Sequence, residues 1–196
     1  MFWFGLPGAG KSTFANALLK RESNIEYLSS DELRKEFPND KDNHIAIFDE
    51  MHRRTISALN NNIDVIYDST NLEFKFRKKL FDKVKDNNAN TMIFGVFIHK
   101  GVKNAVCQSE KRIGREDVNS ELINKMYVTM QLPTIGEDCD AIIIPEVSLV
   151  ETEYKIVGSK IYDKENFNTF IKEVKSIDSD LVLKYYKEKE DDMYEI

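Results

Sequence analysis

The chain has 196 residues, 41% of them hydrophobic, and its 28 Lys and Arg against 34 Asp and Glu give a formal net charge of −6. This length predicts one domain with a small appendage, and the apolar content suffices for a buried core. No apolar run approaches the roughly 18 residues of a membrane-spanning helix, and the negative charge argues against a polyanionic partner.

Targeting signals and disulfides are not expected. Only four residues precede the first glycine-rich loop, which leaves no room there for a signal or transit peptide. The two cysteines, Cys107 and Cys139, lack C-x-x-C or metal-ligand spacing, so we expect reduced thiols. These features together predict a cytoplasmic protein.

The chain opens with a short apolar strand over residues 1–4, a phosphate-binding loop and a helix over residues 11–20. Gly5-Leu6-Pro7-Gly8-Ala9-Gly10-Lys11-Ser12 matches G-x-x-x-x-G-K-[ST] at every fixed position. The glycines let backbone N–H groups face phosphates, and the helix N-terminus adds partial positive charge. Lys11 can reach the β- and γ-phosphates, and Ser12 can hold Mg²⁺. The alternative, a glycine-rich turn, would not require the flanking strand and helix. We therefore predict that ATP·Mg²⁺ is bound by Gly8, Ala9, Gly10, Lys11, Ser12 and Thr13.

A second strand over residues 26–29 leads into a helix over 31–37. Asp31 follows the strand end and could accept the proton of an attacking hydroxyl as a general base. Arg34 lies one turn later and could hold a phosphate or orient Asp31. The alternative is an ordinary helix start, with Ser30 or Asp31 as N-cap and Arg34 on a solvated face.

A helix over residues 43–60 precedes a third strand over 63–68 that ends in Asp68. Apolar residues followed by an aspartate are typical of a Walker-B strand, so Asp68 could bind Mg²⁺ together with Ser12. Thr70 and Asn71 follow at the same edge and are candidate substrate-binding residues. The alternative is a turn in which one of them caps the next helix.

Basic residues gather in two further places. The helix predicted over residues 73–86 carries six Lys and Arg, which could guide a nucleic-acid strand or form a solvated face. Lys111-Arg112-Ile113-Gly114-Arg115 lies between helices predicted over 102–112 and 119–131. A basic segment with a central glycine suits a lid whose arginines neutralise the transferring phosphoryl group. The alternative is a basic helix C-terminus.

Strands alternate with helices along most of the chain, with further strands predicted over residues 91–98 and 141–145. The pattern predicts an α/β fold with a mostly parallel sheet and helices on both faces. With the phosphate loop and a helical lid, this is the expectation of a P-loop NTPase or kinase fold. The kinase domain is expected over residues 1–146, with its lid at about 108–118. Residues 147–196 are expected to form an acidic C-terminal extension, with a strand over 153–157 and short helices over 166–174 and 181–187.

Together these motifs resemble the P-loop kinase domain of phage and bacterial polynucleotide 5′-hydroxyl kinases, from Phe2 to about Pro145. Leu28-Ser29-Ser30-Asp31-Glu32-Leu33-Arg34 is similar to that family's D-x-x-R element, and Asp68-Ser69-Thr70-Asn71 to its D-x-T-N strand end. Gln108-Ser109-Glu110-Lys111-Arg112-Ile113-Gly114-Arg115 is similar to its lid.

The resemblance implies Asp31 as the base that activates a 5′-hydroxyl and Arg34 as a contact to the 3′-phosphate of the acceptor nucleotide. It implies Arg112 as the transition-state arginine and Arg115 as a second basic lid residue at the ATP site. The chain departs from the family at the lid, where Gln108-Ser109 replaces the usual Arg-Asn.

Three functions are compatible with this sequence. The first is transfer of the γ-phosphate of ATP to the 5′-hydroxyl of DNA or RNA, so that nucleic-acid 5′ ends are the partner. The second is phosphorylation of a small acceptor such as a nucleoside, nucleotide or modified base, which the net charge and the altered lid favour. The third is a nucleotide-dependent regulatory ATPase, against which the D-x-x-R element argues.

Overall fold

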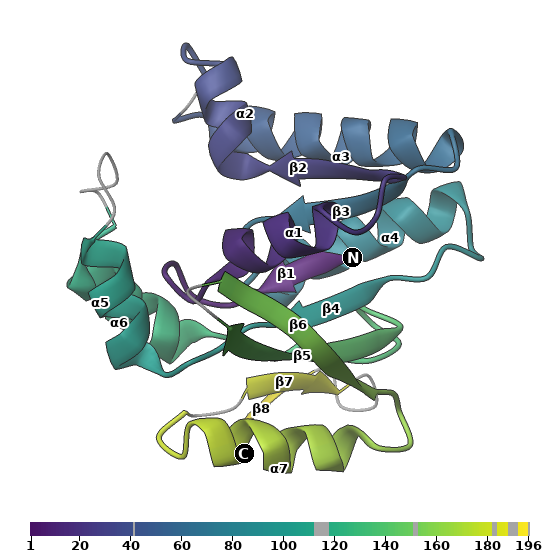
Figure 1. Ribbon diagram of the computed structural model, residues 1–196. Coiled ribbons are helices and arrows are strands. Elements are labelled where there is room, and N and C mark those ends of the chain that lie inside the picture. The colour runs from purple at the N-terminus through teal and green to yellow at the C-terminus, as the bar shows by residue number, and fades with distance from the viewer. Residues whose placement is uncertain (41, 112–117, 151–152, 182–183, 188–191, 196) are drawn as a thin grey trace.

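The computed structural model describes residues 1–40, 42–111, 118–150, 153–181, 184–187 and 192–195. A six-stranded sheet in the order β2-β3-β1-β4-β5-β6 forms its centre (Figure 1). The first five strands pair in parallel, and β6 pairs antiparallel with β5. The mostly parallel sheet predicted from the sequence is therefore confirmed. The strands are β1 (Phe2–Phe4), β2 (Ile25–Ser29), β3 (Asp64–Asp68), β4 (Phe94–Phe97), β5 (Ala141–Val150) and β6 (Glu153–Tyr162).

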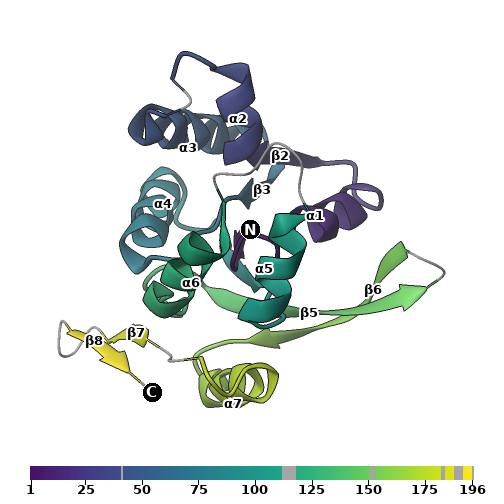
Figure 2. The same cartoon turned by 90° about the vertical axis from the view of Figure 1, so that its left-hand side faces the viewer.

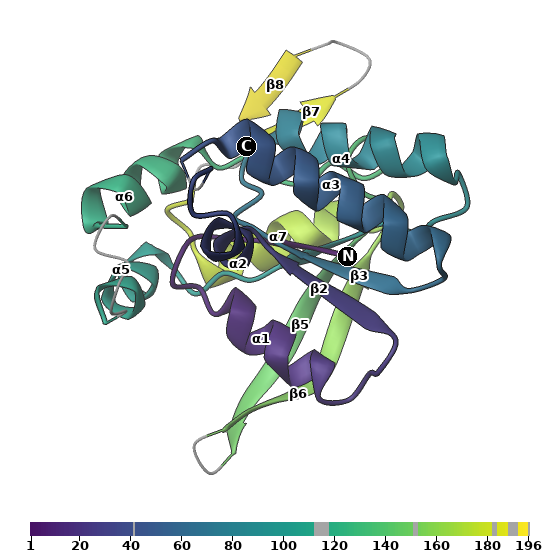
Figure 3. The same ribbon diagram turned by 90° about the horizontal axis from the view of Figure 1, so that it is seen from above.

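Helices cover both faces of the sheet, as expected. Figure 3 shows α1 on one side of the strands and the parallel pair α3 and α4 on the other, while Figure 2 shows α5 and α6 side by side. The helices are α1 (Lys11–Leu19), α2 (Ser30–Glu36), α3 (His44–Asn60), α4 (Phe74–Asn87), α5 (Val102–Glu110), α6 (Ser120–Thr129) and α7 (Phe167–Ile177).

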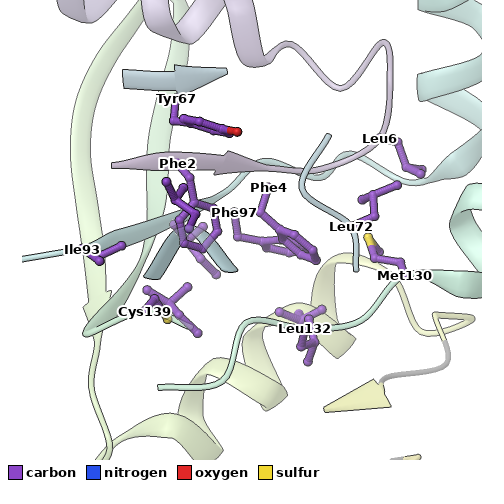
Figure 4. Packing of buried hydrophobic residues seen from close by; sticks show 14 of the residues in the cluster. Phe2, Phe4, Leu6, Tyr67, Leu72, Ile93, Phe97, Met130, Leu132 and Cys139 are labelled. Atoms are coloured by element: carbon purple, nitrogen blue, oxygen red, sulfur yellow. The ribbon is translucent and has the colours of Figure 1, made fainter. Parts of the chain in front are cut away.

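Successive strand residues supply two separate cores because a strand alternates its side chains between faces. Phe2 and Phe4 of β1 join a large cluster of buried apolar residues (Figure 4). Leu80 of α4 belongs to the same cluster. Trp3, between Phe2 and Phe4, joins a smaller cluster with Ala15 of α1. The two cores hold helices against opposite faces of the sheet. The parallel pairing of the first five strands places their carboxyl ends at one edge.

One helix predicted in the C-terminal segment is wrong. Residues 184–187 form strand β7 (Lys184–Lys187), which pairs antiparallel with β8 (Asp192–Glu195). Tyr185 and Tyr194 are paired positions in the register of this ladder. Tyrosine favours a paired strand over a short isolated helix, so cross-strand pairing outweighs the weak helical pattern. The predicted extra strand and first short helix are confirmed as β6 and α7.

The basic helix α4 contains a buried cation that the sequence pattern did not distinguish from its solvated neighbours. The side chains of Arg77 and Asp138 are both fully buried and form an ion pair of 2.8 Å. Arg77 also donates to the carbonyls of Asn71 (2.8 Å) and Leu132 (2.9 Å), and its guanidinium lies 5.2 Å from the centre of the Phe4 ring. Arg77 therefore ties α4 and the segment before β5 to the loop after β3.

Candidate active site

The glycine-rich loop joins β1 to α1 and packs closely against the rest of the fold. A Cβ on Gly8 would lie 2.2 Å from the carbonyl oxygen of Ala105, and Gly8 has a φ of +81°, so a larger residue would be strained there. Gly10 has a φ of +102° and begins α1 without any side-chain cap. Among the described residues, no atom beyond its immediate chain neighbours lies within 4 Å of the Cβ position of Gly10. On this side of Gly10 the described residues therefore leave room, and a helix N-terminus is where a phosphate group is favoured.

Lys11, the predicted phosphate ligand, is buried at the start of α1. Its ammonium group donates to the carbonyl oxygens of Gly5 and Leu6, each at 2.8 Å. These contacts hold the lysine side chain along the loop, close to the backbone that would surround a phosphate. Ala9 is buried beside it, whereas Ser12 and Thr13 are exposed in the first turn of α1.

Ser12 and Asp68, the predicted Mg²⁺ ligands, meet although they are 56 residues apart. The Ser12 hydroxyl donates to Oδ2 of Asp68 at 3.1 Å, and Asp68 is buried at the end of β3. A hydroxyl beside a carboxylate at a phosphate loop fits Mg²⁺, which takes few protein oxygens and completes its shell with phosphate and water. Among the residues that the structure describes, no group of three or more His, Cys, Asp and Glu could hold a metal by itself.

Tyr27 is a third member of this cluster, and sequence analysis missed it. Its hydroxyl donates to the same Asp68 oxygen at 2.5 Å. Burial, then the hydrogen bond and the negative charge of Asp68, raise the pKa of Tyr27, so its hydroxyl remains a donor at neutral pH. The sequence does place a tyrosine, whose hydroxyl can donate, near the end of the predicted second strand. Its partner Asp68 could not be predicted, because only the pairing of β2 with β3 brings the two residues together.

Asp31 and Arg34 both lie on α2, directly after β2. Ser29, not Ser30 or Asp31, caps the helix by accepting from the Asp31 N–H at 3.3 Å. The capping role considered for the Asp31 carboxylate is therefore taken by another side chain. Arg34 lies 3.6 Å from Asp31 Oδ1, donates to the Ser30 carbonyl at 3.0 Å and contacts His44 Nδ1 at 3.2 Å. Arg34 thus links α2 to the first residue of α3.

Thr70 and Asn71, the candidate substrate residues, lie in the turn after β3. The Thr70 carbonyl accepts from the Gly5 N–H at 3.3 Å. Asn71 is buried with a φ of +49°, and its amide donates to the Trp3 carbonyl at 2.6 Å. Neither residue caps α4, whose N-cap is Glu73. The side chain of Asn71 connects this turn to β1, and its contact with substrate stays a prediction.

The predicted lid lies between α5 and α6. Arg112 and Arg115, its two candidate arginines, fall outside the described residues. The helices on either side are held together at the base of this segment, where the Ser109 hydroxyl donates to the Val118 carbonyl at 3.2 Å. Because Gly8 packs on Ala105 of α5, the predicted lid begins on a helix that touches the phosphate loop.

The parallel sheet, the glycine-rich loop between β1 and α1, and the paired Ser12 and Asp68 define a P-loop nucleotide-binding protein. A family model described as AAA domain (AAA_33) matches residues 1–133, which is more than half of the chain. The chain therefore belongs to this family, and it is a P-loop kinase domain. P-loop kinases use ATP and typically Mg²⁺.

Comparison with individual proteins identifies distant relatives. An L-seryl-tRNA(Sec) kinase from Methanococcus maripaludis is 29% identical over 192 residues, covering 91% of this chain and 72% of the relative. A chain of the Pnkp1/Rnl/Hen1 complex is 22% identical with a TM-score of 0.48, covering 59% of this chain and 41% of that one. A gluconokinase from Sinorhizobium meliloti 1021 is 17% identical with a TM-score of 0.46, and the match covers 74% of this chain and 79% of the gluconokinase chain. Both TM-scores are below 0.5. The fold is therefore assigned from the strand topology, the phosphate loop and the matching family model.

Among the described residues, none of the helices is both long enough and apolar enough to cross a membrane.

Proposed function

We propose that this protein transfers the γ-phosphate of ATP to a hydroxyl group. The observation that carries the proposal is the 3.1 Å contact between Ser12 and Asp68, at the edge of the sheet where the phosphate loop begins and Asp31 follows the adjacent strand β2. A kinase requires a phosphate cradle, magnesium ligands and a base at one place. In this proposal the N–H groups of the loop and Lys11 hold the phosphates, and Ser12 and Asp68 hold Mg²⁺, which offsets phosphate charge.

Asp31 is assigned the role of general base. It accepts the proton of the acceptor hydroxyl while the hydroxyl oxygen forms a bond to the γ-phosphorus in line with the departing ADP oxygen. Arg34 orients Asp31 or holds a phosphate of the acceptor. Arg112 is assigned to the spreading charge on the γ-phosphoryl group, and Arg115 to the ATP phosphates. Most of the rate enhancement in such a site comes from position and electrostatics.

The acceptor that we propose is a hydroxyl carried by a nucleic acid, with the 5′-hydroxyl of DNA or RNA as first choice. The D-x-x-R element and the basic lid segment support it, because both resemble those of polynucleotide kinases. Thr70 and Asn71 are proposed as further acceptor contacts. A small acceptor such as a nucleoside remains the competing class, since the net charge of −6 does not favour a polyanion.

A second candidate acceptor is the seryl hydroxyl of a charged tRNA. The relative from Methanococcus maripaludis, whose similarity covers 91% of this chain, is named for that substrate. That acceptor is also a hydroxyl on a nucleic acid, so the same base and phosphate loop would serve. The match covers 72% of that relative, so part of it lies outside the region of similarity.

We also propose that residues 1–146 form the kinase unit and that residues 147–196 form a C-terminal extension. Asp178, after α7, accepts a hydrogen bond of 3.1 Å from Tyr127 of α6 and lies 2.7 Å from His99, just beyond β4. These contacts support an extension that braces the kinase unit and does not swing independently. A cytoplasmic location remains part of the proposal.

The test is transfer of labelled γ-phosphate from ATP to a panel of acceptors. The panel contains 5′-hydroxyl DNA and RNA oligonucleotides, seryl-tRNA, 3′-nucleoside monophosphates and free nucleosides. Asp31→Asn should lower the rate by about 10²–10⁴-fold while nucleotide binding persists. Glu32→Gln removes the neighbouring carboxylate of the same helix and should have little effect.

Each outcome of this panel has a defined meaning. Label on oligonucleotides or on seryl-tRNA selects between the two nucleic-acid acceptors, and their binding should weaken steeply with salt. Label on nucleosides alone moves the protein to the small-acceptor class. Slow hydrolysis of ATP with no acceptor stimulation would leave a regulatory ATPase and refute the kinase assignment for this chain.

A further inference from the structure

The hydroxyl group of Tyr27 occupies a position that none of the sequence motifs explains. Tyr27 belongs to β2, outside the phosphate loop and the D-x-x-R element. Its oxygen lies 2.5 Å from Oδ2 of Asp68, the same atom to which Ser12 donates at 3.1 Å. In the described part of the chain, the hydroxyls of Ser12 and Tyr27 therefore both donate to the same oxygen of the Asp68 carboxylate. That convergence fixes the orientation of the carboxyl group.

The ring of Tyr27 is held in place by the smaller core. It packs against the cluster of Trp3, Ala15 and Ile66, on the face of the sheet that α1 covers. Parallel pairing of β2 with β3 sets Ser29 opposite Asp68 and Tyr27 opposite Ile66. Since side chains two residues apart point to the same face, the tyrosine reaches along its strand toward the end of β3. Packing of the Tyr27 ring therefore positions its hydroxyl and restricts the side chain to few rotamers.

We propose that Tyr27 is a positioning residue that holds the Asp68 carboxylate in the orientation required for Mg²⁺. This inference rests on the proposed function, in which Ser12 and Asp68 are the magnesium ligands. A hydrogen bond to one carboxylate oxygen limits rotation of the group and leaves the other oxygen for the ion or its water. Partners of this kind orient metal ligands, and their loss typically lowers metal affinity about 10–100-fold.

Ser12 cannot replace Tyr27 in this role. Ser12 is itself a proposed ligand, so its hydroxyl must turn toward the ion when Mg²⁺ binds. The hydrogen bond from Tyr27 is then the contact that still restrains Asp68. Tyr27 therefore acts on the site as a hydrogen-bond donor to Asp68.

The experiment measures binding of a fluorescent ADP analogue to the full chain while Mg²⁺ is titrated. Tyr27→Phe should raise the Mg²⁺ concentration for half-maximal binding by about tenfold, at the lower end of the range for such partners. Affinity for the analogue in excess chelator should not change. Tyr67→Phe is the matched control, since it removes a buried phenol hydroxyl from the neighbouring strand β3 and should leave the titration unchanged.

A second background distinguishes positioning from general loosening of the fold. In an Asp68→Asn variant, adding Tyr27→Phe should cause no further rise in the Mg²⁺ requirement, because the oriented group is already altered. A merely structural tyrosine would weaken binding equally with and without Mg²⁺ and in both backgrounds. That result, or a Tyr27→Phe titration identical to wild type, overturns the role of Tyr27 alone. If the affinity of the wild-type chain for the ADP analogue does not depend on Mg²⁺, both the proposed function and this inference are overturned.

Discussion

The buried ion pair between Arg77 and Asp138 offers the sharpest test of how this fold is held together. The Arg77 guanidinium donates hydrogen bonds of 2.8–2.9 Å to the Asp138 carboxylate and to the carbonyls of Asn71 and Leu132. Asp138 uses its second oxygen to accept from the Thr134 N–H at 2.8 Å. Replacing Arg77 by Met keeps much of the apolar stem but leaves a carboxylate and two carbonyl groups without their donor.

The expected loss of stability is large. Removing one partner of a buried ion pair costs about 3–5 kcal/mol, because the remaining charge stays buried without compensation. Burial already raises the pKa of the Asp138 carboxyl, and Arg77 opposes this by favouring the charged form. Without Arg77, the carboxyl can lessen the penalty only by taking up a proton. With a urea m value of about 2.5 kcal/mol per M, a loss of about 4 kcal/mol lowers the midpoint by about 1.6 M.

Urea unfolding followed by tryptophan fluorescence measures this directly. Trp3 is the one tryptophan in the sequence, and it is completely buried in β1. Lys78→Met is the matched control. Lys78 follows Arg77 on α4 but forms a partly exposed ion pair with Asp82, so its loss should cost less than about 1 kcal/mol. Asp138→Asn added to Arg77→Met should cost little more, because the unpaired charge is then gone.

A loss below about 1 kcal/mol for Arg77→Met would refute this reasoning. It would mean that water reaches the guanidinium site, or that the segment before β5 rearranges to satisfy Asp138. An Arg77→Met cost no greater than that of Lys78→Met would lead to the same conclusion.

Two further predictions concern buried histidines. Burial, followed by the positive charges of two lysines on α4, lowers the pKa of His52 to about 4. Since the unfolded chain then binds the proton more tightly, stability should fall as pH drops from about 6.5 to 4, by up to about 3 kcal/mol at about 1.4 kcal/mol per pH unit. His52→Phe should flatten that slope in urea unfolding at several pH values, and an unchanged slope would contradict the assignment. Asp178→Asn, which weakens the contacts to His99 and Tyr127, should cost about 1–3 kcal/mol. Exposed Asp180→Asn should cost less than about 0.5 kcal/mol, and equal losses for the two would contradict an anchoring role for Asp178.

Local spacing in the sequence predicted most of the fold and the phosphate loop, and the resemblance of the motifs to a known family predicted the kinase class. The loop from Gly5 to Ser12 requires a preceding strand and a following helix, and the alternation of apolar strands with amphipathic helices requires a parallel sheet covered on both faces. These inferences succeed because each depends on residues that are neighbours in the chain. The helix expected over residues 181–187 failed because a short pattern there is decided by the pairing of β7 with β8.

Tertiary contacts alone decided which polar residues are paired and with what. Tyr27 and Asp68 are separated by 41 residues, Arg77 and Asp138 by 61, and His99 and Asp178 by 79. The spacing of apolar and polar residues along the chain does not predict contacts between residues so far apart. From the sequence, Arg77 therefore could not be distinguished from its solvated neighbours on α4, nor Tyr27 from an ordinary strand residue. The sequence by itself determined the phosphate loop and the layered sheet, because both follow from short-range backbone geometry. The orientation of Asp68, the cap at Ser29 and the buried charges were decided only when the strands paired and brought distant side chains together.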